Sequence, residues 1–182
     1  MITRVERMRR RTWIVVGAAV LVVLGAVTLI WFQPQKLFYD NTVDEAIPSA
    51  SATAEPTDAT ASPAPAEPEE LARGTFISRE HETTGTARIL RLADGQQILR
   101  LEGFETSNGP ALFVYLSQNP ADGEDGAFDD DYIDLGELKG NVGDQNYVIP
   151  AEIDPLGYAS VVVWCDRFSV SFGAADIAAS DA

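Results

Sequence analysis

A run of twenty residues without a charged side chain, from Trp13 to Phe32, must leave water if this chain is to be stable. A helix rises about 1.5 Å per residue, so this run would extend roughly 30 Å, which is the thickness of the hydrocarbon core of a bilayer. Trp13 and Trp31 stand near its two ends, where aromatic side chains meet the membrane surface. The sequence therefore predicts one transmembrane helix over residues 13–32.

The charges before this run predict its orientation. Positively charged flanks stay in the cytoplasm, so we expect a cytoplasmic tail over residues 1–12, a single pass through the cell membrane and an extracytoplasmic C-terminal part. A cleaved signal peptide is the alternative, but its apolar region is usually about 7 to 15 residues long and ends at small residues. The tail holds one acidic residue, Glu6, against five arginines: Arg4, Arg7, Arg9, Arg10 and Arg11.

The part of the chain after Phe32 is strongly acidic. It holds 8 of the 13 Lys and Arg residues and 27 of the 28 Asp and Glu residues, a net charge of −19. Nucleic-acid binding depends on Lys and Arg that neutralise phosphates, so this charge excludes a nucleic-acid partner. The membrane contact that we expect is the chain's own helix.

Composition divides the acidic part into two regions. Residues 33–73 are rich in Ala, Pro, Ser, Thr and Glu and hold too few large apolar side chains to offset the entropy of ordering, so we expect a disordered linker that acts as a spacer. Residues 74–182 are long enough for one small domain with one core.

Within residues 74–182, short β-branched and aromatic runs alternate with turn residues, and helical periodicity is absent. Asp94 and Gly95 predict a tight hairpin, and 108–110 (Asn-Gly-Pro) another turn. We expect an all-β domain, an antiparallel β-sandwich or a partly closed barrel. Its predicted strands are 75–78, 86–92, 97–102, 112–117, 132–135, 146–149, 159–164 and 168–172.

Several short sequence matches, in one order along almost the whole predicted domain, resemble the electron-transfer DM-thirteen domain family. They comprise Gly74-Thr75-Phe76, His81, Thr84-Gly85, Phe104, Asn108-Gly109-Pro110, Leu112 to Leu116, Leu135 to Gly140, Gly143 to Tyr147, Pro150, Val163-Trp164-Cys165, Phe168 to Val170 and Phe172 to Ala175. The resemblance implies a β-rich domain with a redox role centred on the cysteine that matches Cys165. In one departure, Ala111 stands where the family commonly has Asp, so any contribution of that carboxylate is lost here.

Cys165 is the only cysteine of the chain, so no disulfide can form within it. One interpretation is an inert thiol buried as a small apolar group. The other is a redox thiol or ligand, with Arg167 two residues further on as a possible stabiliser of the thiolate. An extended strand would place Cys165 on the face opposite Trp164, and a bulge at residues 165–167 would re-aim the thiol.

His81 is the only histidine and lies in a polar segment, either as a residue that organises a loop or as a ligand. Blue copper needs two His with one Cys, and both methionines, Met1 and Met8, precede the apolar run, so the usual haem ligand pairs are missing. A haem or metal would have His81 and Cys165 as ligands. The acidic stretch 122–131 is a solvated loop or a cation site, without the EF-hand spacing.

These observations favour a membrane-tethered extracytoplasmic domain in redox or electron transfer, more an accessory component than an enzyme with its own turnover. A single thiol needs a second redox group, so we expect a redox partner protein at the cell surface or a bound cofactor. The alternative is a non-catalytic binding or adhesion module in which Cys165 is structural.

Overall fold

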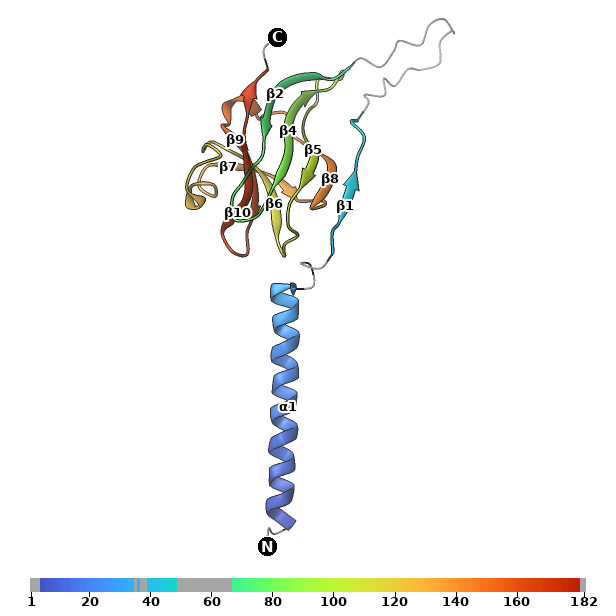
Figure 1. Ribbon diagram of the computed structural model, residues 1–182, viewed down its shortest axis with the longest axis vertical. Coiled ribbons are helices and arrows are strands. Elements are labelled where there is room, and N and C mark those ends of the chain that lie inside the picture. The colour runs from blue at the N-terminus through green and yellow to red at the C-terminus, as the bar shows by residue number, and fades with distance from the viewer. Residues whose placement is uncertain (1–3, 35, 37–38, 49–66, 181–182) are drawn as a thin grey trace, which may run out of the picture.

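The computed structural model describes residues 4–34, 36, 39–48 and 67–180. It begins with one long helix, α1 (Arg4–Phe32), which extends away from a β-domain (Figure 1). The stretch Arg11–Phe32 of this helix has a mean hydropathy of 2.7, and none of its most apolar part is buried against the rest of the protein. The predicted helix is confirmed, and it is long and apolar enough to cross a membrane.

The β-domain consists of two sheets that face each other (Figure 1). The six-stranded sheet has the order β1-β8-β5-β4-β2-β11, and the five-stranded sheet has the order β3-β10-β9-β6-β7. The strands are β1 (Thr42–Asp44), β2 (Glu69–Thr75), β3 (Ile77–Ser78), β4 (Thr84–Arg91), β5 (Gln97–Glu105), β6 (Leu112–Ser117), β7 (Tyr132–Glu137), β8 (Val142–Val148), β9 (Ser160–Cys165), β10 (Val170–Asp176) and β11 (Ala178–Ala179).

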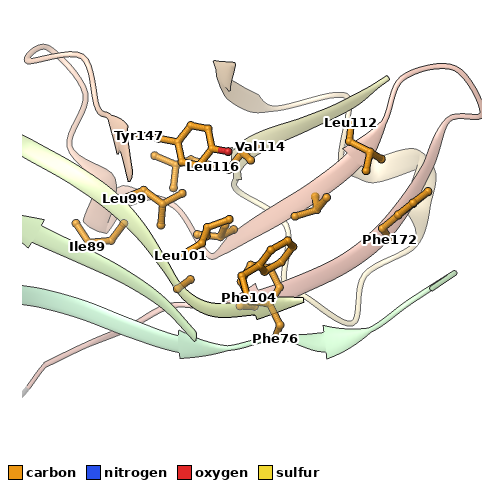
Figure 2. Packing of buried hydrophobic residues seen from close by; sticks show 14 of the residues in the cluster. Phe76, Ile89, Leu99, Leu101, Phe104, Leu112, Val114, Leu116, Tyr147 and Phe172 are labelled. Carbon is orange, nitrogen blue, oxygen red and sulfur yellow. The ribbon is translucent and has the colours of Figure 1, made fainter. Parts of the chain in front are cut away.

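All strand pairs are antiparallel except β1 with β8, which is parallel. The sheets do not close into a barrel, so the predicted all-β sandwich is confirmed. Alternate residues of both sheets point into the space between them and form the core (Figure 2). Figure 2 shows Leu99 and Leu101 of β5 packed with Val114 and Leu116 of β6, and Phe104 beside Phe76.

The five-stranded sheet is buried on its outer face as well. Trp164 and Tyr115 form a second apolar cluster there, which is closed by Phe128 from the loop between β6 and β7. Arg79 holds this loop in place, because its guanidinium donates to the carbonyls of Ala121 (3.3 Å) and Gly123 (2.5 Å). This double burial explains why every residue of β9 is inaccessible to water.

The chain joins the sandwich earlier than its composition indicates. Strand β1 lies within the range that composition assigns to the linker, and so does most of β2. β1 pairs in parallel with the edge of β8, and Ile47 packs on an apolar cluster formed by Leu90, Leu92 and Ile98. The remaining part of the predicted linker, residues 49–66, lies outside the described residues.

Two glycines make room for β1. A Cβ atom on Gly140 would lie 2.4 Å from the Asn41 carbonyl oxygen, and one on Gly143 would lie 2.0 Å from that of Val43. Gly143 also has a φ of +104°, a conformation that residues with a Cβ rarely adopt. Gly143 lies inside β8, where its missing side chain allows another backbone to approach closely.

Glu45, directly after β1, is the polar anchor of this segment. Its carboxylate accepts hydrogen bonds from the Lys139 ammonium (2.9 and 3.0 Å) and from the Asn146 N–H (2.8 Å). Burial raises the pKa of Glu45, but the hydrogen bonds from Lys139 and Asn146 outweigh burial and hold the pKa below its ordinary value of 4.5.

This lowered pKa predicts acid-sensitive docking of β1. A carboxyl whose pKa is lower in the folded state stabilises the fold fully above its ordinary pKa, and that contribution is lost as pH falls through the folded pKa. We expect the Glu45→Gln variant to lose less stability than the wild type between about pH 6 and about pH 3, measured by urea unfolding of the full chain. Glu152→Gln, at an exposed carboxyl, is the control and should follow the wild type.

Candidate functional site

Cys165 is the last residue of β9, directly before the turn whose residues Arg167 and Phe168 contact the C-terminal end of α1. It pairs with Val170 across a hairpin and with Leu112 on the other side. Its side chain points into the core between the sheets, opposite to Trp164. The residue has no exposed surface, so the sulfur is not reachable from water in this conformation.

The surroundings of the sulfur favour the neutral thiol. Burial raises the pKa of Cys165 above its ordinary value. Hydrogen bonds from the backbone at Phe168, Arg167 and Ala111 lower it without offsetting burial, and the nearby carboxylate of Asp166 raises it further. A reactive thiolate therefore requires a rearrangement that brings water or a positive charge to the sulfur.

Residues 166–169 form the turn that covers Cys165. The N–H groups of Phe168 and Ser169 donate to the Cys165 carbonyl (3.2 and 2.9 Å), and Ser169 has a φ of +51°. These contacts reverse the chain, so the strand predicted over 168–172 begins only at Val170. An extended strand would continue to place successive side chains on opposite faces of the sheet, but this alternation ends at Cys165 because the chain turns there.

Ala111 lies directly beside the cysteine, because its carbonyl accepts a hydrogen bond from the Asp166 N–H (3.0 Å). Ala111 therefore lies opposite Asp166, whereas its neighbour Leu112 pairs with Cys165. Because successive residues of a strand point to opposite faces, a side chain at position 111 points away from the face that carries the thiol.

Arg167 directs its side chain away from the sulfur. Its guanidinium lies 4.8 Å from the centre of the Trp31 ring and donates a hydrogen bond to the Trp31 carbonyl. Phe168 contacts the helix as well, with its ring 6.3 Å from that of Phe32. The turn over Cys165 thus touches the C-terminal end of α1.

His81 lies in the segment between β3 and β4 and packs on β10. The centre of its imidazole ring lies 3.9 Å from the centre of the Phe172 ring, and its backbone N–H donates to the Phe172 carbonyl (3.3 Å). Phe172 belongs to the same core cluster as Cys165. His81 lines an apolar cavity of about 390 Å³ that Cys165 does not line, so the two residues do not share a cavity.

The described residues contain no group of three or more His, Cys, Asp or Glu side chains placed to hold a metal ion. A haem with His81 and Cys165 as ligands does not fit this arrangement, because the cysteine has no exposed surface. In the acidic stretch, Asp125 contacts Arg79 (3.3 Å) and accepts a hydrogen bond from the Ser171 hydroxyl. Asp125 therefore helps to fasten the loop to the sheet.

The cavity beside His81 was not predicted, because its walls come from segments far apart in the chain. Phe32, Pro110, Phe168 and Phe172 meet there only after folding. One signal was available in the sequence, since Phe168 stands among polar residues where a turn would expose it. It is 49% exposed.

Two packed sheets with one buried thiol define a small β-sandwich domain, and the helix before it is long and apolar enough to cross a membrane. The chain belongs to the electron-transfer DM-thirteen family, because the family model described as "Electron transfer DM13" matches residues 75–177. No curated protein and no solved structure matches the chain. Membership of this family supports a redox or electron-transfer role.

Proposed function

We propose that this protein is held in the cell membrane by α1, with its β-domain outside the cytoplasm, and takes part in electron transfer through Cys165. The family match over most of the sandwich carries this proposal. The apolar stretch Arg11–Phe32 and the basic tail before it support the anchor and its orientation.

The reaction that suits a single thiol is exchange with a disulfide of a partner protein. The Cys165 thiol loses its proton and attacks one sulfur of the partner's disulfide. One S–S bond forms between the two proteins, the partner's S–S bond breaks, and the second partner sulfur leaves as a thiolate. The new S–S bond uses the electron pair of the Cys165 thiolate, and the electron pair of the broken S–S bond leaves with the second partner sulfur, so no further oxidant is needed.

Burial of Cys165 requires that the turn over residues 166–169 opens before this exchange. The turn is held by two backbone hydrogen bonds to the Cys165 carbonyl and by the contacts of Arg167 and Phe168 with the helix end. Such short segments open locally at a much lower free energy than the whole domain. A partner that binds the helix end and the turn together would therefore control access to the sulfur.

The second candidate function is a binding or adhesion module at the cell surface with a structural cysteine. One observation favours it: Cys165 is fully buried in the core, and burial raises the pKa of its thiol. In that case the sulfur acts as a small apolar group and its replacement by alanine leaves function intact.

Loss of electron transfer on replacement of Cys165 distinguishes these two functions, and labelling of the thiol measures how often the turn opens. We expect native Cys165, in the full chain in detergent, to react with iodoacetamide on the order of a hundredfold more slowly than the unfolded chain, because the turn must open first. A small-molecule disulfide should form a mixed disulfide with Cys165 of the wild type, and the rate of this reaction should be limited by the same opening of the turn.

Cys165→Ala should abolish mixed-disulfide formation and electron transfer to the partner while the fold is retained. Val163→Ala is the matched control, since Val163 lies on the same face of β9, is equally buried and keeps the thiol in place. Undiminished electron transfer by Cys165→Ala would show that the cysteine is structural.

A further inference from the structure

An apolar cavity of about 390 Å³ lies between the end of α1 and the β-sandwich. This volume is sufficient for a small ring compound, since ligand cavities usually measure about 300 to 1,000 Å³. The exposed surface of its lining is predominantly apolar. Its apolar walls are formed by Phe32, Pro34, Pro110, Phe168, Val170 and Phe172. Polar residues line it as well, among them Gln33, Lys36, Glu80 and Asn108.

His81 supplies a polar group to this apolar cavity. Its imidazole packs on Phe172 with ring centres 3.9 Å apart and an angle of 36° between the rings. Within the described part of the chain, no hydrogen bond engages the imidazole nitrogens, whereas the His81 backbone N–H and carbonyl are both bonded. A half-buried imidazole without a partner, beside aromatic walls, is suited to bind an oxygen atom of a ligand.

The position of the cavity indicates where its ligand comes from. Phe32 is the last residue of the helix, and Trp31 before it is an aromatic residue of the kind that marks the membrane surface. The cavity therefore lies where the hydrocarbon core meets water, if α1 spans the membrane as proposed. A molecule dissolved in the bilayer can reach it without crossing water.

Phe168 gives an independent indication of a ligand. Its ring is 49% exposed at the edge of the cavity, although the ring of Phe32 stands 6.3 Å away and nearly parallel to it. An aromatic ligand that packs against Phe168 and Phe172 would remove this apolar surface from water.

We propose that the cavity binds the ring of a lipid-soluble quinone or quinol, with the His81 imidazole hydrogen-bonded to a ring oxygen and the isoprenoid tail directed to the bilayer. Flat aromatic walls, an imidazole without a hydrogen-bond partner in the described residues and access from the membrane together match this class of molecule. The choice of a redox-active ring rests on the proposed electron-transfer function.

The test uses the full chain in lipid nanodiscs free of quinone, titrated with a short-chain benzoquinone by calorimetry. We expect saturable binding that weakens about tenfold in Phe168→Ala, because part of a buried aromatic contact is lost. His81→Phe keeps the aromatic packing and removes the hydrogen bond, so it should weaken binding about fivefold.

Leu156→Ala is the matched control. Leu156 is also 49% exposed but does not line the cavity, so its replacement should leave the dissociation constant unchanged. Absence of saturable binding would overturn the proposal. Equal binding of a saturated cyclohexane analogue would overturn it too, since the cavity would then be a general site for acyl chains or detergent.

Cys165→Ala separates this proposal from the proposed function. Cys165 does not line the cavity, so this variant should bind the benzoquinone like the wild type. Binding in both proteins, with electron transfer also equal in both, would refute the role of Cys165 and leave the quinone site standing. Loss of electron transfer in Cys165→Ala, without quinone binding in either protein, would refute the quinone site alone.

Discussion

Replacement of Gly143 by alanine is expected to release β1 from the sandwich and to lower the free energy of unfolding by roughly 3 kcal/mol. A Cβ atom there would lie 2.0 Å from the Val43 carbonyl oxygen, which no side-chain movement can relieve. The φ of +104° adds backbone strain. Urea unfolding of the full chain measures the loss, and limited proteolysis near Thr42 reports the release of β1.

Gly136→Ala is the matched control for this variant. Gly136 lies in β7 with a φ of +112°, but a Cβ atom on it would meet nothing within 4 Å. It should therefore cost only the backbone strain, about 1 to 2 kcal/mol, and leave β1 protected from protease. Equal effects of the two substitutions would mean that close packing of β1 contributes nothing to stability.

Arg100→Met is expected to destabilise the protein by about 3 kcal/mol, at the lower end of the range for a broken buried ion pair. The Arg100 side chain is 6% exposed and forms an ion pair with Asp144. It also donates to the Glu45 carbonyl (2.9 Å) and the Asn146 amide oxygen (3.1 Å). Methionine fills a similar volume but leaves the Asp144 carboxylate without its cation, which urea unfolding should detect.

The surface pair of Arg91 and Glu69 provides the comparison. Their side chains are 43% and 63% exposed at a separation of 2.9 Å, so Arg91→Met should change stability by no more than about 0.5 kcal/mol. The double variant Arg100→Met, Asp144→Leu should recover part of the loss, because it no longer leaves a charge unpaired. No recovery would indicate that Arg100 stabilises the fold through its hydrogen bonds to Glu45 and Asn146.

Local patterns were sufficient to predict the sandwich. Short runs of apolar residues bounded by turn residues mark β5, β6 and β9, and Gly95 adopts the positive φ (+87°) that the predicted hairpin requires. The loop between β4 and β5 is longer than two residues, because the hydrogen bond that closes it runs from the N–H of Leu92 to the carbonyl of Gln96 (2.8 Å). The apolar runs therefore predicted where the strands lie, whereas the exact ends of the strands depend on hydrogen bonds that cannot be seen in the sequence.

Contacts between distant segments explain what the sequence did not reveal. Strand β1 has only three residues in a stretch poor in large apolar side chains, and its stability comes from partners about a hundred positions away, such as Lys139 and Asn146. For Cys165 the sequence left two orientations open, and the structure has the one opposite Trp164. The complete burial of Cys165 depends on the turn over residues 166–169.

The pairing of β1 with β8 limits the distance between the β-domain and the end of α1. Only residues 33–41 separate α1 from β1. Even if this segment were fully extended, β1 would lie within roughly 30 Å of the last helical turn. The strands before and after residues 49–66, β1 and β2, belong to the same sheet, so this segment does not increase the distance between α1 and the β-domain. With α1 in the membrane, as we propose, a redox partner of this domain would therefore have to bind at the bilayer surface or lie within the bilayer.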